Sequence, residues 1–199
     1  MSDPHLDLLD YRRRVNEMYD TVRALRHRDP RAAHRLWCER RDDLFRSHPQ
    51  SALPPEERVS FRGLLYREYD PELAFTATVR PLAHERYGVD TSTGGVIHFV
   101  RFGAVDLPIG TLEVLWLDEY SGGVFLPFRD ATSGKTTYGG GRYLLDTAKG
   151  ADLGSRGDEL VLDFNFAYHP SCHYDPKWVC PLAPLGNRLA VAVDAGELA

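Results

Sequence analysis

The amino-acid sequence predicts an α+β protein that is mainly antiparallel β, a sandwich or a partly closed barrel, with an N-terminal helical hairpin. Two observations carry this prediction. Apolar residues recur at helical spacing through the first fifty residues. Short segments rich in Val, Ile, Thr, Tyr and Phe then follow, separated by glycine and proline. We therefore expect the helical hairpin at residues 1–50 to pack on an antiparallel β domain at residues 51–199.

The first helix is predicted over residues 4–27. Asp3 can cap its N-terminus, and Pro4 suits the first helical position. A narrow apolar seam follows at alternating steps of three and four residues: Leu8, Tyr11, Val15, Met18, Val22 and Leu25. We expect this seam to be buried, either inside the molecule or at a homodimer interface formed through the first helix.

The second helix is predicted over residues 30–47. Asp29 can cap it, Pro30 can begin it, and Pro49 stands beyond its end. Its apolar side carries Ala33, Leu36, Trp37, Leu44 and Phe45. Because a short loop between helices makes them antiparallel neighbours, the two should form a hairpin that covers an edge or an open end of the β domain.

The β domain is predicted to begin beyond Pro54 and Pro55. Its strand candidates are residues 75–82, 95–102, 111–117, 124–129, 136–138, 142–145, 160–166 and 189–193. They follow one another closely, without helical stretches between them, which favours antiparallel pairing over parallel β-α-β units. Turn-forming residues at 118–123 and 131–134 separate consecutive strands, as hairpin loops would.

Charge and composition exclude several classes of protein. The 24 basic and 29 acidic residues give a net charge of −5, so the strongly basic face of a nucleic-acid-binding protein is not expected. No apolar run approaches the roughly 20 residues that cross a bilayer, and the first residues lack the order of a signal peptide. Three cysteines are too few for a disulfide scaffold. We therefore expect a soluble, cytoplasmic protein without nucleic-acid or membrane partners.

The segment from Ser133 to Thr137 has the sequence of the end of a phosphate-binding P-loop, SGKTT. Such a loop needs a leading glycine five residues before its second glycine, and Arg129 stands there. A hairpin loop is therefore the preferred interpretation. The glycine run at 139–141 is either a bend in a β region or a place where a ligand or anion approaches bare backbone amides.

A ligand site is predicted where three strand segments meet at one end of the core. Arg142 follows the glycine run, and Arg129 ends the preceding strand. Asp163 and Asn165 share one side of a predicted strand. We expect Arg142 or Arg129 to pair with an acid, foremost Asp163, since a buried arginine needs a carboxylate. The predicted function is binding of a small polar or anionic molecule by Arg129, Tyr138, Gly140, Arg142, Asp163 and Asn165; a purely structural ion pair is the alternative.

The segment from His169 to Cys180 allows three interpretations. His169, Cys172, His173 and Cys180 are four possible zinc ligands, but their spacing lacks the close cysteine pair of known sites, so we predict no metal and no cofactor. Cys172, with His169 or His173 and Asp163, would supply the nucleophile, base and orienting acid of a hydrolase. Alternatively, Cys172 and Cys180 pack under a proline-braced loop, close enough to form a disulfide if oxidised.

Besides ligand binding and hydrolysis, a third class of function is open to the whole protein: an interaction module that acts through the N-terminal helices.

Several stretches together resemble a known family. The resemblance lies in WCERRDDLF at 37–45 with SHP at 47–49, FRD at 128–130, TYGGGRYL at 137–144, LDFNFAYHP at 162–170 with Cys172, CPLAP at 180–184, NRL at 187–189 and AGE at 195–197. These stretches resemble the family called domain of unknown function 1684, from about Trp37 onward. His169 departs from the family, which has asparagine there. The resemblance implies no activity.

Overall fold

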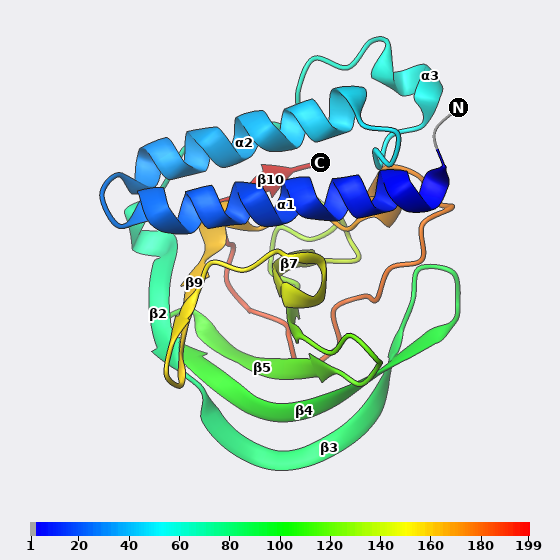
Figure 1. Ribbon diagram of the computed structural model, residues 1–199. Helices are drawn as coiled ribbons and strands as arrows, with labels where there is room; N and C mark the ends of the chain where they lie inside the picture. Colours follow the sequence, from blue (N-terminus) through cyan, green and yellow to red (C-terminus); the bar gives the residue numbers. More distant parts are fainter. Residues whose placement is uncertain (1–2) are drawn as a thin grey trace.

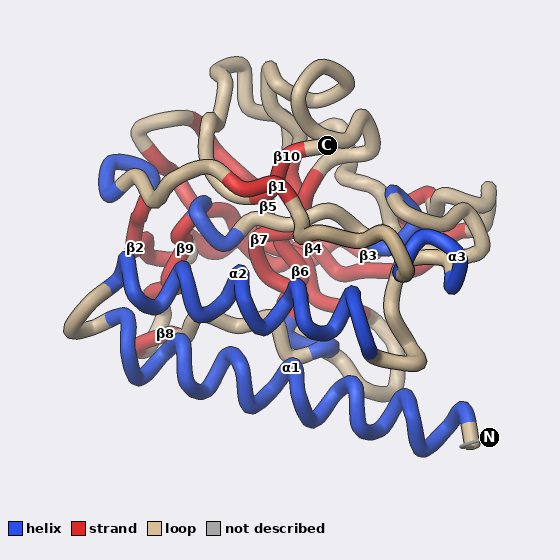
Figure 2. The backbone as a smooth tube through the Cα atoms, turned by 90° about the horizontal axis from the view of Figure 1, so that it is seen from above, coloured by secondary structure: helices blue, strands red, loops and turns tan. Residues whose placement is uncertain are grey.

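The computed structural model describes residues 3–199 and confirms the predicted fold class. Two N-terminal helices accompany sheets whose paired strands are antiparallel, and no closed barrel forms among these residues. The two long helices lie side by side across one end of the molecule, and the largest sheet curves around the opposite end (Figure 1). Seen from above, both helices lie on one side of the strands (Figure 2).

Both helices begin at the caps that the sequence predicts. Helix α1 spans Pro4–Arg26, and the Asp3 carboxylate accepts the His5 N–H at 2.8 Å. Helix α2 spans Pro30–Ser47, and Asp29 accepts the Ala32 N–H at 2.9 Å. A side chain that satisfies an otherwise unpaired N–H stabilises a helix N-terminus, so these starts are fixed locally.

The apolar seam of α1 is buried inside the molecule. This is the first of the two predicted arrangements; the other was burial at a homodimer interface. Val15, Met18 and Val22 are 9% exposed or less and belong to one cluster with Trp37 of α2 and Phe166 of the β domain. The prediction fails only at the start of the seam, where Leu8 is 40% exposed. No helix among residues 3–199 is long and apolar enough to cross a membrane.

The largest sheet is a five-stranded antiparallel meander in the order β3-β4-β5-β6-β7. Its strands are Arg80–Asp90, Val96–Leu107, Gly110–Leu117, Val124–Phe128 and Arg142–Asp146. Because side chains alternate along a strand, adjacent residues of β5 enter different clusters: Val114 joins Phe164, whereas Leu115 joins Phe99 and Phe125. Each face of the curved sheet is therefore buried over part of its length.

Two small sheets complete the fold. Strands β2 (Ala74–Thr78), β9 (Glu159–Asp163) and β8 (Ser155–Arg156) form one, and β1 (Leu65–Tyr66) with β10 (Glu197–Leu198) forms the other. Short helical segments connect them: α3 (Pro55–Arg58), η1 (Pro71–Leu73), η2 (Thr147–Lys149), η3 (Phe164–Phe166) and η4 (Ser171–His173). The pairing of β1 with β10 brings the far end of the chain alongside α2, where Glu197 of β10 pairs with Arg41 of α2.

Several predicted strands are wrong in detail. The candidate at 75–82 is divided at Val79, because β2 pairs with β9 whereas β3 pairs with β4. The candidates at 136–138 and 189–193 form turns and loop, with an isolated backbone bridge at Thr137 in the first. The candidate at 160–166 leaves strand geometry at Asp163, whose carboxylate accepts the Asn165 N–H at 3.1 Å and caps η3. That local hydrogen bond competes with the strand ladder.

Candidate functional site

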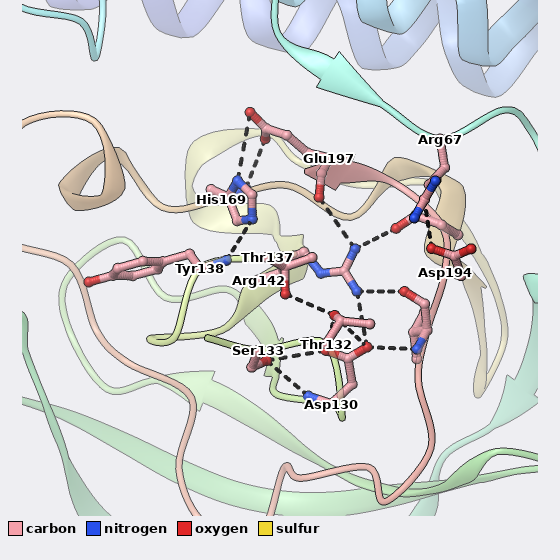
Figure 3. A network of polar contacts seen from close by, with 12 residues as sticks. Arg67, Asp130, Thr132, Ser133, Thr137, Tyr138, Arg142, His169, Asp194 and Glu197 are labelled. Carbon is pink, nitrogen blue, oxygen red and sulfur yellow. Dashed lines mark hydrogen bonds and ion pairs between the residues drawn. The ribbon is translucent and has the colours of Figure 1, made fainter. Parts of the chain in front are cut away.

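Arg142 lies in the core, but its carboxylate partner is Asp130 and not Asp163. The two side chains are 1% and 0% exposed, and Arg142 Nη2 lies 3.4 Å from Asp130 Oδ2. The guanidinium also donates to the backbone carbonyls of Val193, at 2.9 Å, and Ala195. Figure 3 shows the guanidinium enclosed by these groups. The expected pairing of Arg142 with a buried acid is thus confirmed, but the predicted partner, Asp163, is wrong.

Asp130 gathers the segment that resembles a P-loop. Its carboxylate accepts the Thr132 hydroxyl at 2.8 and 2.9 Å, the Ser133 hydroxyl at 3.2 Å and the Val193 N–H at 2.6 Å. Thr132 in turn lies 2.9 Å from the Thr137 hydroxyl (Figure 3). The hydroxyl groups of this loop are thus hydrogen-bonded to a carboxylate of the protein itself. The loop is a structural turn and not a phosphate-binding loop.

Asp163 and Asn165 belong to a second buried network, which faces the helices. The Asp163 carboxylate accepts the Tyr69 hydroxyl at 3.0 Å and the Asn165 amide at 2.7 Å. Asn165 also bonds both backbone groups of Asp70, at 2.8 Å each. Burial raises the pKa of Asp163. Neither residue is hydrogen-bonded to either predicted arginine within residues 3–199, because the chain turns into η3 directly after Asp163.

Arg129, Tyr138 and Gly140 lie nearer the surface. The Arg129 backbone pairs with Asn187 and Leu189, and its buried Nε has no hydrogen-bond partner among the described residues. Gly140 lies against the Tyr138 ring. Gly141, with φ of +96°, passes so near β6 that a Cβ would lie 2.6 Å from the Phe128 carbonyl oxygen. The glycine run is thus needed for a bend in the chain.

A third buried network, centred on Glu197, was not predicted from the sequence. Its carboxylate, 0% exposed, accepts Arg41 Nη2 at 2.8 Å, the His169 N–H at 2.9 Å and the Tyr174 hydroxyl. The Glu197 backbone carbonyl also lies 3.5 Å from Arg142 Nη1, which joins this network to that of Asp130 (Figure 3). The carboxylate therefore has a donor on each oxygen and an arginine for its charge.

Arg41 reaches Glu197 from within a shell of aromatic rings. Its guanidinium carbon lies 4.9 Å from the ring centroids of Trp37 and Tyr168 and 5.4 Å from that of Phe45. A signal for this was present in the sequence, since Arg41 stands four residues after Trp37 and four before Phe45, on the apolar side of α2. An arginine at such a position needs a buried acid.

His169 is held as a neutral imidazole. Its Nε2 accepts the Tyr138 N–H at 3.1 Å, so the proton of the neutral ring is on Nδ1. Nδ1 is buried without a hydrogen-bond partner, 3.9 Å from Glu197 Oε1. Burial, with the nearby charges of His173, Arg142 and Arg41, lowers the pKa of His169 to about 2. A base with this pKa cannot take a proton from a nucleophile at neutral pH.

The hydrolase arrangement is therefore not assembled. Asp163 lies in the Tyr69 network, and the His169 nitrogen that would accept a proton is engaged by Tyr138. The four possible zinc ligands do not converge either, since no group of three or more His, Cys, Asp or Glu residues among residues 3–199 is arranged to hold a metal ion.

Two adjoining cavities offer space for a ligand. One, of about 210 Å³, is lined largely by apolar residues: Ile97, Phe99, Leu117, Phe125, Val179 and Pro181. The other, of about 100 Å³, lies under the helical hairpin and is bordered by Arg41 and four tyrosines: Tyr11, Tyr19, Tyr143 and Tyr168. Both share Asp146 and Lys149, whose charged groups lie 3.4 Å apart. None of the six predicted ligand residues borders either cavity.

Fold and networks define an α+β protein in which a helical hairpin is tied to antiparallel sheets by one buried arginine–carboxylate pair, Arg41–Glu197. The chain belongs to the family described as "Protein of unknown function (DUF1684)", whose model matches residues 59–198. This confirms the predicted resemblance. The motif at 37–49 lies ahead of the matched range, although Arg41 supplies a central part of the buried network.

A solved structure from Haloarcula marismortui is similar to this chain. It is the solution NMR structure of an uncharacterized protein from gene locus rrnAC0354, 36% identical, with a TM-score of 0.56. The match covers 81% of this chain and 90% of that chain. A search of the curated proteins gave no match.

Proposed function

We propose that the protein binds a small molecule in the apolar cavity beside β4, β5 and β6. The ligand has an aromatic or aliphatic body and one polar group that both donates and accepts hydrogen bonds. The observation that carries this proposal is the make-up of the cavity: apolar side chains from three strands, with a single ion pair, Lys149–Asp146, at its border. Ligand sites are commonly mostly apolar, with few polar groups that fix orientation.

The ion pair suits a polar head better than a charged one. Lys149 is 57% exposed and can move to donate a hydrogen bond, whereas the Asp146 side chain is 9% exposed and can accept one. An anionic head would be attracted by Lys149 but repelled by Asp146, and a cationic head would meet the reverse. Two larger hollows, between α1 and α2 and beside α2, are lined by charges of both signs and offer no comparable apolar wall.

Three probes with one ring and different heads test this proposal: benzamide, benzoate and benzylamine. Isothermal titration calorimetry should show benzamide binding more tightly than the two charged probes. Ala148→Leu, which fills the cavity from the half-buried segment η2, should weaken benzamide binding at least tenfold. Ala24→Leu, the same change on the exposed side of α1, is the matched control and should leave binding unchanged. Absence of binding by all three probes, or an unchanged affinity in Ala148→Leu, would refute the proposal.

A homodimer through the first helix stays a prediction. Most of the seam that suggested it is buried inside the molecule, but Leu6, Leu8 and Leu9 at the start of α1 are 64%, 40% and 43% exposed. A cytoplasmic location likewise stays a prediction.

A further inference from the structure

Cys172, in η4, and Cys180, in the segment that follows η4, lie close together outside the proposed ligand cavity, and Cys180 borders the smaller neighbouring cavity. Both cysteines are free, and they are 9% and 4% exposed. The Cys172 N–H, in η4, donates to Cys180 Sγ at 3.4 Å. This hydrogen bond places the two cysteines side by side already in the reduced protein.

The surroundings of the two thiols differ from those of Cys38. Tyr138 places its hydroxyl 3.8 Å from Cys172 Sγ, and the Ser92 hydroxyl accepts the Cys180 N–H at 3.2 Å. The hydrogen bond from Cys180 is the main cause that lowers the pKa of Cys172 to about 6, with Ser92 and Tyr138 contributing. Burial raises the pKa of Cys38 to about 12. At neutral pH, only Cys172 combines a thiolate with a second thiol beside it.

We propose that Cys172 and Cys180 are a redox-active thiol pair, in which a hydroperoxide oxidises Cys172 and Cys180 then closes a disulfide. Two contacts support it: the hydrogen bond from the Cys172 N–H to Cys180 Sγ, which sets the two cysteines side by side, and the Tyr138 hydroxyl beside Cys172 Sγ. The activity is separate from the proposed ligand binding, and neither depends on the other.

The two steps balance without a metal or cofactor. In the first, the Cys172 sulfur attacks the terminal oxygen of the hydroperoxide, an S–O bond forms, the O–O bond breaks, and the alkoxide or hydroxide leaves with a proton as alcohol or water. In the second, the Cys180 sulfur attacks the Cys172 sulfur, an S–S bond forms, and the S–O bond breaks. The departing hydroxide takes the Cys180 proton and leaves as water. The peroxide is reduced by two electrons, which both thiols supply.

The experiment treats the reduced full-length protein with hydrogen peroxide at neutral pH, alkylates the remaining thiols, and maps the cysteine peptides by mass spectrometry. We expect a Cys172–Cys180 disulfide to form at least tenfold faster than any oxidation of Cys38, and dithiothreitol to reverse it. Cys38→Ser is the matched control, and its disulfide should form at the wild-type rate. In Cys180→Ser, a sulfenic acid should accumulate on Cys172 and be trapped by dimedone.

Two results would overturn the proposal. One is oxidation of Cys38 and Cys172 at equal rates. The other is oxidation of Cys172 in the wild type to the sulfinic or sulfonic acid while Cys180 remains a free thiol that alkylation then labels. Cys180 would in that case not act as the second thiol. Both are read in the wild-type protein, so the test does not depend on the folding of Cys180→Ser. Tyr138→Phe adds a separate readout: it should slow peroxide oxidation of Cys172 and leave that of Cys38 unchanged.

Discussion

Two arginine–aspartate pairs in this molecule have the same chemistry but opposite surroundings. Arg80 and Asp106 join β3 to β4 through two contacts of 2.9 and 3.2 Å, with both side chains more than half exposed. Arg142 and Asp130 make one longer contact of 3.4 Å, with both side chains enclosed. The better geometry therefore belongs to the exposed pair. Because breaking a buried pair leaves an unpaired charge out of water, the longer contact should nevertheless matter far more for stability.

The largest effect should separate these two pairs directly. Asp130→Ala leaves the Arg142 guanidinium buried without its carboxylate, and we expect the free energy of unfolding to fall by about 3–5 kcal/mol. Asp106→Ala, the matched change in the exposed pair, should cost far less, because water already solvates both charged groups. Urea denaturation of both variants measures the difference. Should Asp130→Ala fail to fold, Asp130→Asn provides the comparison, and equal losses at the two positions would show that burial is not the deciding factor.

An intermediate effect is expected at His169, which burial and the nearby charges of His173, Arg142 and Arg41 keep neutral. Its pKa in the folded protein is about 2, below the ordinary 6.5, so the unfolded chain binds a proton that the folded one rejects as the pH falls below 6.5. The stabilisation that neutral His169 provides is therefore complete above pH 6.5. Below pH 6.5 the free energy of unfolding falls by about 1.4 kcal/mol per pH unit. His169→Asn removes the titrating group and can still accept the Tyr138 N–H.

Unfolding curves at pH 7 and pH 5 test this prediction. Acidification to pH 5 should destabilise the wild type by about 2 kcal/mol more than His169→Asn, from the same slope. His84→Asn, at an exposed position in β3, is the control and should keep the wild-type dependence on pH. An unaltered pH dependence in His169→Asn would show that His169 is not held neutral.

The smallest effect concerns salt. Arg86 and Asp118 form another exposed pair, 2.5 Å apart with side chains 59% and 39% exposed. Arg86→Ala should lower the free energy of unfolding by about 0–1 kcal/mol, and this loss should shrink in 1 M sodium chloride, where screening is strong. The loss in Asp130→Ala should persist, since salt does not reach a buried pair. A salt-sensitive loss in Asp130→Ala would place that pair in contact with solvent.

The helices could be predicted because their signals are local. Asp3 with Pro4, and Asp29 with Pro30, set the two starts within a few residues of sequence. Most of β3 was missed because it is an edge strand with much of its length exposed, so polar residues such as His84, Glu85 and Arg86 hide the alternation that marks a half-buried strand. The sequence also gives no sign that the chain changes its partner strand at Val79, because the residues on both sides of Val79 form strands.

The candidate site shows a different limit. Sequence identified Arg142 as a buried arginine that needs an acid, but it could not choose between acids. Asp163 has a hydrogen-bonding amide two residues away and serves the capping of η3, whereas Asp130 is brought to Arg142 by the bend at Gly141. Cavity walls are harder still to predict, because they depend on how β4, β5 and β6 curve against the segment around Val179.

The contact between Arg41 and Glu197 also constrains the order in which the molecule can fold. The two residues are 156 positions apart in the chain. Closing so long a loop is entropically costly, and distant contacts of this kind slow folding, whereas the meander needs only neighbouring strands. During synthesis, α2 emerges with its arginine long before the carboxylate exists. Until then the guanidinium must stay hydrated, so we expect the hairpin to dock fully only when β10 arrives, as a late step of folding.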